Sequence, residues 1–334
     1  MAWEAAHTSN AGGATWNRVQ KLLSKAREVA GECPSDYANG IVTMSSGVAD
    51  WTNGRWSNAL PKLASAEKTF RDNCQNTAWE LVTTQTFLLW ALFYLGRFEE
   101  LDVRARELVD LARDRGNIYA ESTHGTFSYP MAILAAGNPS GARDIIQTSL
   151  DKWTHESFHV QHSLALMAKT YIDLYEGNAM VCYQRYQEFW PQLKKSNLLF
   201  VATVRMFNLH LRARSCLAAY RVKPDDSLLA RAERDAKKII RARISGCVPH
   251  GQHILAGVAA ARGESQNAAQ LFEQARRGYD KAVMPVFAKA VAIRRNQILH
   301  GDKSDLVVQT KQKLGMHLAG ADIDRFCNAI AVEV

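Results

Sequence analysis

Apolar and small residues recur along this chain with the spacing of one helix face. The clearest unit begins at Gly96, which is followed by Leu101, Ala105 and Leu108 at offsets of five, nine and twelve residues. Offsets that differ by four and three place these side chains on the same side of an α-helix. The pattern therefore predicts an amphipathic helix that starts just after a glycine and packs one narrow face against a neighbour.

The same unit occurs at four more glycines, Gly54, Gly137, Gly177 and Gly263. The first four glycines of the series are 42, 41 and 40 residues apart, and the last interval of 86 is two units of 43. One further helix keeps the offsets but has Ser227 where the glycine should be. A sustained period of this size in helical sequence is typical of solenoids built from stacked repeats.

Each glycine is preceded by a mostly apolar segment, so it should end one helix and open the turn to the next. Glycine takes the left-handed conformation that terminates helices, and a short turn favours antiparallel packing. The expected fold is all-α, an α-solenoid of antiparallel helix pairs. Its offsets are tetratricopeptide-like, but its period of about 40 residues exceeds the ~34 usual in that repeat.

We expect a single helical-repeat domain over residues 1–334, with a partial first repeat at 1–31 and closing helices at 302–334. Residues 1–11 look like the last turns of a helix whose start is missing. The hypothesis is that the chain is a piece of a longer protein or that its start is misplaced. Pro130 should kink or split the helix expected at 118–136. The helix after Gly54 should start late or kink at Pro61, and the helix expected at 179–195 should bend near its end at Pro191. Asp225 is placed to cap the helix after Pro224.

Composition supports a packed, soluble helical protein. Apolar residues make up 47% of the chain, and the mean hydropathy is −0.23. The longest apolar run, 87–95, is shorter than the ~18 residues that span a bilayer, and no signal peptide is visible. Six scattered cysteines without a C-x-x-C pair indicate reduced packing thiols, and hence a cytoplasmic protein. The net charge of +8 is spread among acidic residues.

Two groups of residues have spacings that could suit a metal. A zinc site needs about four ligands in tetrahedral geometry, and neither group matches a zinc signature. We interpret them as packed or groove-lining side chains and predict no metal and no cofactor. The groups are His155, His159 and His162, and Cys247, His250 and His253.

The sequence contains no phosphate-binding loop, no kinase signature and no nucleophile elbow. We therefore expect a non-catalytic chain that acts by binding a protein or peptide. In tetratricopeptide-like stacks the first helix of each pair lines a concave surface, and polar residues on those helices would form a groove there. Salt bridges between repeats, or simple solvent exposure, are the alternatives. The candidate groove residues are Glu80, Thr84, His124, His159, His162, Arg205, Asn208 and Arg212. Trp79, Trp90, Trp153 and Trp190 are predicted to pack in the core or between repeats and not to serve as ligand platforms.

The segment 228–244 is rich in Lys and Arg but also contains Glu233 and Asp235. A nucleic-acid surface needs a stripe of one sign of charge, so a solvated helix face is the favoured interpretation and nucleic acid an unlikely partner. A repeat domain of a nucleic-acid-binding transcriptional regulator stays open as the alternative function.

Several packing motifs resemble one known family. They are residues 78–81 (AWEL), 89–96 (LWALFYLG), 158–162 (FHVQH), 172–177 (IDLYEG) and 209–214 (LHLRAR). They are similar to the C-terminal, tetratricopeptide-like helical-repeat region of large bacterial serine/threonine protein kinases of the planctomycete and myxobacterial kind, in which a kinase domain and an ATPase module precede the repeats. The resemblance covers roughly residues 1–300. It implies a regulatory or scaffolding tail in signal transduction, and it carries over no catalytic residue.

Overall fold

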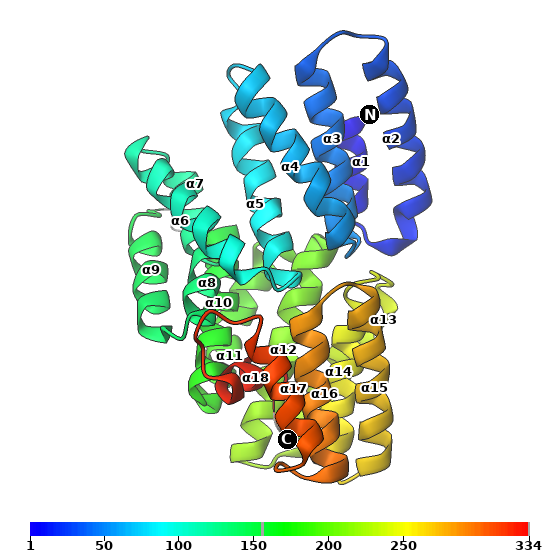
Figure 1. Cartoon of the computed structure of the whole chain (residues 1–334), viewed down its shortest axis with the longest axis vertical. Helices are drawn as coiled ribbons and strands as arrows, with labels where there is room; N and C mark the ends of the chain where they lie inside the picture. The colour runs from blue at the N-terminus through cyan, green and yellow to red at the C-terminus, as the bar shows by residue number, and fades with distance from the viewer. Residues whose placement is uncertain (155–156, 333–334) are drawn as a thin grey trace.

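A computed structural model describes residues 1–154 and 157–332, and within them the chain forms helices and no strand (Figure 1). The α-helices in chain order are α1 (Ala2–Ser9), α2 (Trp16–Gly31), α3 (Asp36–Thr52), α4 (Trp56–Asn73), α5 (Ala78–Tyr94), α6 (Phe98–Asp114), α7 (Ile118–Gly125), α8 (Ser128–Ala135), α9 (Pro139–Asp151), α10 (Val160–Glu176), α11 (Ala179–Lys195), α12 (Ala202–Val222), α13 (Asp226–Arg241), α14 (Val248–Ala261), α15 (Ser265–Lys281), α16 (Pro285–His300), α17 (Asp305–Gly315) and α18 (Ile323–Ile330). Short 3₁₀ turns, η1 (Gly13–Thr15) and η2 (Leu198–Phe200), precede α2 and α12.

The predicted helix pairs are confirmed. All five turn glycines have positive φ, between 69° at Gly96 and 83° at Gly137. The residues five and nine positions after each are buried, as Ala59 and Leu63 are in α4. Asp225 accepts a hydrogen bond from the Ser227 amide at 2.8 Å and so caps α13 without a glycine. The fold is an all-α helical-repeat solenoid.

The prolines act locally, as helix geometry requires. Thr126 and Phe127 separate α7 from α8, so the helix expected at 118–136 is split just before Pro130. Pro61 and Pro191 lie inside α4 and α11. A proline has no N–H, so Pro61 cannot donate the usual helical hydrogen bond to the Ser57 carbonyl.

The superhelix turns so tightly that the chain meets itself again after about five helix pairs. The Ser245 hydroxyl donates to the Asn53 carbonyl at 2.9 Å, and the Ala202 amide donates to the Asn10 carbonyl at 2.9 Å. In Figure 1 the helices α1–α5 lie above, and α13–α17 lie below them. The turns of the early pairs therefore rest on the loops of the late pairs, and we call these two stacks the upper and lower layers.

An aromatic cluster joins the layers at the centre of the molecule. Phe207 of α12 stacks on Tyr94 of α5 with ring centres 4.8 Å apart, and it also contacts Trp51 of α3 at 5.9 Å. Phe287 of α16 contacts Phe93 at 6.3 Å. The first helices of successive pairs thus pack against one another across the superhelix axis, and their side chains fill the space that an open solenoid would leave as a concave groove.

The last helix closes this arrangement. α18 packs between α10 and α16, where Asn328 donates to the Leu174 carbonyl at 3.0 Å. Phe326 contacts Phe98 of α6 with ring centres 5.6 Å apart. Most of the buried apolar side chains form one cluster that extends from Ala2 to Val332, and two smaller clusters are centred on Leu23 and on Val82.

Candidate functional site

The structure does not bring the eight candidate groove residues together on one open surface. Thr84, His124, Asn208 and Arg212 are buried, with exposed fractions of 0, 1, 0 and 5%. The expectation that they line an open groove is wrong, because the first helices converge at the centre instead of facing solvent. Of the two alternatives, salt bridging between repeats describes Arg212.

Two of the buried candidates, Arg212 and Asn208, bond to side chains of other helices. Arg212 makes a two-pronged ion pair with Asp235 of α13, both bonds at 2.7 Å, and its guanidinium carbon lies 3.3 Å from the centre of the Trp190 ring. Asn208 donates to the Ser163 hydroxyl at 3.2 Å and ties α12 to α10. Arg212 and Asn208 therefore connect neighbouring repeats.

The other four candidates are partly exposed, and only His159 and His162 among them contact each other. Glu80 accepts a hydrogen bond from the Tyr37 hydroxyl at 2.8 Å at the outer end of the upper layer. The ring nitrogen Nδ1 of His162 accepts from the His159 amide at 3.0 Å at the start of α10. Arg205 donates to the Leu199 carbonyl at 2.7 Å. Their role in binding stays a prediction.

Of the two groups considered for a metal, the one formed by Cys247, His250 and His253 packs inside the protein. His155 lies outside the described residues. Cys247 is buried, and burial raises the pKa of its thiol to about 12. His250 and His253 face the Tyr279 hydroxyl, with His250 Nδ1 at 2.8 Å and His253 Nδ1 at 3.4 Å. Among the described residues no group of His, Cys, Asp and Glu has a geometry that could hold a metal ion.

Two further polar side chains of α12, His210 and Arg214, are buried in the core near His250 and His253. The His210 and His250 ring centres are 4.2 Å apart, and burial lowers the pKa of His250 to about 3. Arg214 of α12 is fully buried, and its three nitrogens find no hydrogen-bond partner in the described parts of the chain. Its guanidinium carbon lies 4.8 Å from the Tyr171 ring centre. This cationic charge is surrounded by neutral aromatic rings and adds electrostatic strain to the interior.

An open groove lies where the upper layer meets the loop between α15 and α16. It has a volume of about 630 Å³, and we call it the interlayer groove. Its walls are mainly apolar, and Arg97, Glu100 and Arg104 stand along α6 on one side. The lining residues are Ser57, Leu60, Pro61, Ala64, Leu88, Leu95, Arg97, Glu100, Arg104, Val283 and Pro285.

Two backbone features of the interlayer groove, at Val283 and at Ser57, depart from the conformation or hydrogen bonding of regular helices. Val283 is 51% exposed and has φ of 58°, a backbone conformation that is strained for a β-branched residue. Pro61 leaves the Ser57 carbonyl without its helical donor beside the groove. Arg97 pairs with Glu100, and Arg104 pairs with Glu67 at 3.0 Å and with Glu100 at 3.2 Å. The groove thus offers apolar surface, one backbone acceptor and a balanced ionic edge.

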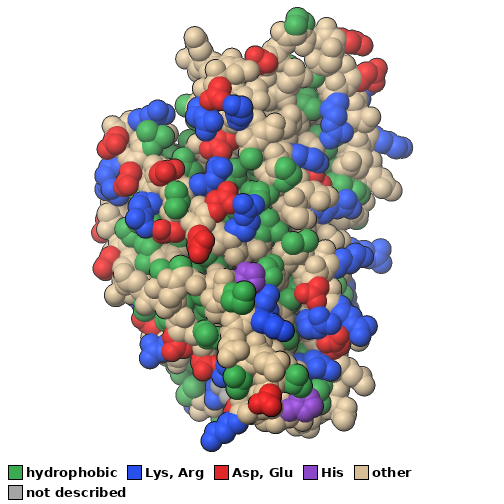
Figure 2. Space-filling model, in the orientation of Figure 1, with side chains coloured by type: hydrophobic (Ala, Val, Ile, Leu, Met, Phe, Trp, Pro, Cys, Tyr) green, Lys and Arg blue, Asp and Glu red, His purple; other side chains and the backbone are tan. Residues whose placement is uncertain are grey.

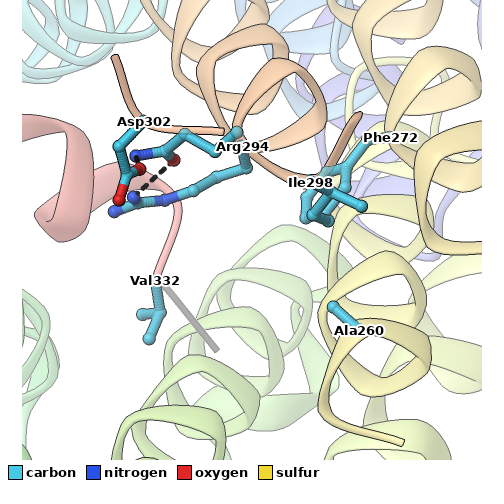
Figure 3. A pocket seen from close by; sticks show the side chains of 7 residues that line it. Ala260, Phe272, Arg294, Ile298, Asp302 and Val332 are labelled. Atoms are coloured by element: carbon cyan, nitrogen blue, oxygen red, sulfur yellow. Dashed lines mark hydrogen bonds between the residues drawn. The ribbon is translucent and has the colours of Figure 1, made fainter. Parts of the chain in front are cut away.

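A smaller pocket of about 220 Å³ lies between α14, α15, α16 and the end of α18 (Figure 3). Figure 3 shows Arg294 and Asp302 on one side of it and Phe272, Ile298 and Ala260 on the other. Gln297 connects the two charged residues: its carbonyl accepts from Arg294 at 2.8 Å and its amide donates to Asp302 at 2.7 Å. We call it the Arg294 pocket.

The outer surface carries charges of both signs. On the face shown in Figure 2, Lys and Arg side chains alternate with Asp and Glu. On α13, Glu233 pairs with Lys237 and also with Arg262 of the next repeat at 2.9 Å. Trp79, predicted to pack in the core or between repeats, is 54% exposed and contacts Trp3 of α1 with ring centres 5.0 Å apart, which is packing between repeats. In the described residues no helix is long and apolar enough to cross a membrane.

Sequence reasoning missed the residues of both hollows. Arg294 carried a usable signal, because it interrupts the apolar face of the helix expected at 285–299. The interlayer groove carried none, since it joins α4–α6 to residues 283–285, about 180 positions away in the chain.

In comparisons with known proteins, no family model and no curated protein matches this chain.

Proposed function

We propose that this chain is a non-catalytic helical-repeat scaffold that binds a segment of a partner protein in the interlayer groove. The observation that carries the proposal is the groove itself: an apolar hollow of about 630 Å³ with a strained, half-exposed valine on its rim. Exposed apolar concavities of this kind mark interaction sites in folded proteins.

The chemistry of the groove favours an amphipathic peptide helix as the occupant. An all-helical surface offers no strand edge for a peptide to extend, so a helix laid between helices is the available mode of recognition. Apolar side chains spaced three or four apart would cover Leu60, Ala64 and Val283, and polar side chains would meet the ionic edge formed by Arg97 and Glu100.

Membership in a signalling assembly of the bacterial kinase type rests on the sequence motifs alone. Those motifs resemble the tail of such kinases, where a groove of this kind would bind a regulator or a substrate. We propose this origin as well, and an in-frame kinase or ATPase module upstream in the gene would test it.

The peptide proposal is tested by selecting a displayed peptide library against the whole chain and measuring the affinity of the enriched peptides by calorimetry. Ala64→Arg places a long charged side chain on the groove wall, and Ala230→Arg makes the same change on exposed α13 as the matched control. We expect the groove variant to weaken binding by about tenfold or more, because buried contacts dominate interface energies, and the control to leave it unchanged.

Enriched peptides that bind Ala64→Arg as tightly as the parent would contradict the groove as the site. Mixed-sequence duplex DNA at low salt is included as a further ligand. Salt-dependent binding of that DNA in place of peptide would favour the nucleic-acid alternative, since phosphate contacts release counterions.

A further inference from the structure

Arg294, a charged residue that lines the Arg294 pocket, has no carboxylate partner among residues 1–154 and 157–332. Arg294 is 7% exposed, and its Nε donates to the Ala331 carbonyl at 2.8 Å. Its other hydrogen bonds go to amide oxygens, Gln297 at 2.8 Å and Asn328 at 3.5 Å. No Asp or Glu of the described chain lies within ion-pair distance of it. Of the two other buried arginines, Arg212 pairs with Asp235 and Arg214 has no hydrogen-bond partner among the described residues.

Neutral acceptors hold the guanidinium in place but do not compensate its charge. A guanidinium has five N–H donors and stays protonated in proteins. The three bonds above use three of them, and two N–H groups remain for a ligand. A buried cation is stable when an anion meets it, and a planar carboxylate is the anion whose shape matches the guanidinium fork.

The remaining walls define the rest of the ligand. Asp302 is exposed at the edge of the pocket, with one carboxylate oxygen already accepting from Gln297 at 2.7 Å and the other available to a cation. Opposite the charged side, Phe272 and Ile298 present apolar surface (Figure 3). A pocket of about 220 Å³ has room for roughly seven water molecules, which suits a ligand of about ten non-hydrogen atoms.

We propose that the Arg294 pocket binds a free α-amino acid with an apolar side chain. The ligand's carboxylate pairs with Arg294, its ammonium group lies at Asp302, and its side chain packs on Phe272 and Ile298. Gln297 bonds to both Arg294 and Asp302 and holds the two charged groups side by side on one wall of the pocket. The carboxylate and the ammonium group of an amino acid are also neighbours, so both can be met at once. This site is separate from the interlayer groove and does not depend on the peptide proposal.

The test is calorimetric titration of the full chain with L-leucine and with two analogues that each lack one charge, 4-methylpentanoate and 3-methylbutylamine. We expect saturable binding of leucine, about tenfold weaker binding of 4-methylpentanoate because it loses the charged hydrogen bond to Asp302, and no measurable binding of the amine. Asp302→Asn should remove the difference between leucine and 4-methylpentanoate. Asp114→Asn, a change on the exposed surface of α6, is the matched control and should preserve it.

A second variant makes the result independent of Arg294, whose loss could disturb the chain end that it anchors. Ala260→Phe fills the pocket from α14 and should abolish leucine binding while the far-ultraviolet circular dichroism stays that of the parent. The proposal is overturned if leucine does not bind at 10 mM. It is equally overturned if Ala260→Phe binds leucine as the parent does, or if leucine and 4-methylpentanoate bind alike.

Discussion

At the scale of single residues, the polar side chains that looked most functional in the sequence are used mostly inside the molecule. Arg212 pairs with Asp235 and stacks on Trp190, and both charged groups are almost fully buried. His124 has no hydrogen-bond partner for either ring nitrogen among the described residues. A polar residue on an otherwise apolar helix therefore does not identify a binding surface until the neighbours of that helix are known.

Burial of His124 gives a first prediction, on acid stability. Its pKa is lowered by burial from 6.5 to about 4, so between these pH values the unfolded chain holds a proton there that the folded chain does not. The free energy of unfolding must therefore fall as pH falls below 6.5. His124→Leu removes this titrating group. Between pH 7 and pH 4.5 we expect the free energy of unfolding to fall by about 2 kcal/mol less in the variant than in the parent.

Urea denaturation at several pH values measures this difference. His7→Leu, which changes an exposed histidine of α1, is the control and should follow the parent. Parallel pH profiles for the parent and His124→Leu would show that the buried imidazole does not contribute to acid sensitivity.

At the scale of helices and turns, the sequence predicted the structure well because the signals are local. The offsets after Gly54 identify a face that packs on the preceding helix of the pair, and the glycine itself supplies the turn. The split before Pro130 and the cap at Asp225 follow from backbone chemistry that needs no distant partner. What the turns touch was not predictable, since the partner residues lie about 190 positions further on.

The turns give a second prediction. Gly54 and Gly263 have nearly the same φ, 71° and 77°, but a Cβ atom at Gly54 would lie 2.4 Å from the Gly246 amide nitrogen, whereas Gly263 has open space. Gly263→Ala should cost about 1 kcal/mol of strain. Gly54→Ala should cost about 3 kcal/mol or more, because it adds a clash with the backbone of the lower layer.

Thermal and chemical denaturation of the two variants, side by side, gives the comparison. Equal losses of stability in Gly54→Ala and Gly263→Ala would mean that the turn at Gly54 is not in tight contact with the lower layer.

At the scale of the whole molecule, the contact between layers changes how the solenoid should unfold. A solenoid whose repeats contact only their neighbours can open from one end, pair by pair. Here the core of each layer is shared with the other through Phe207, Tyr94 and Phe287. Loss of one layer exposes the aromatic surface of the other, so the layers should unfold together.

This is the third prediction, and the distribution of tryptophan makes it measurable. All eight tryptophans lie in residues 3–190. Their fluorescence therefore reports mainly on α1–α11 and on the contacts that Trp51 and Trp190 make with α12, whereas far-ultraviolet circular dichroism reports on every helix. We expect the two signals to give one coincident urea transition. Phe207→Ala should lower the free energy of unfolding by about 3 kcal/mol. The midpoint of the urea transition should therefore fall by the same amount in both signals. Separate midpoints for the two signals in the parent chain would contradict shared unfolding.

The sequence alone determined the helices, their order in pairs, the turn glycines and the stripe by which each second helix packs, because these depend on residues within about twenty positions of one another. It did not determine which polar residues reach solvent. The tertiary structure decided that, since the curvature of the superhelix sums small rotations over many repeats and brings residues about 190 positions apart into contact. That closure buried Thr84, His124, Asn208 and Arg212, and it formed the interlayer groove from α4–α6 and the distant Val283.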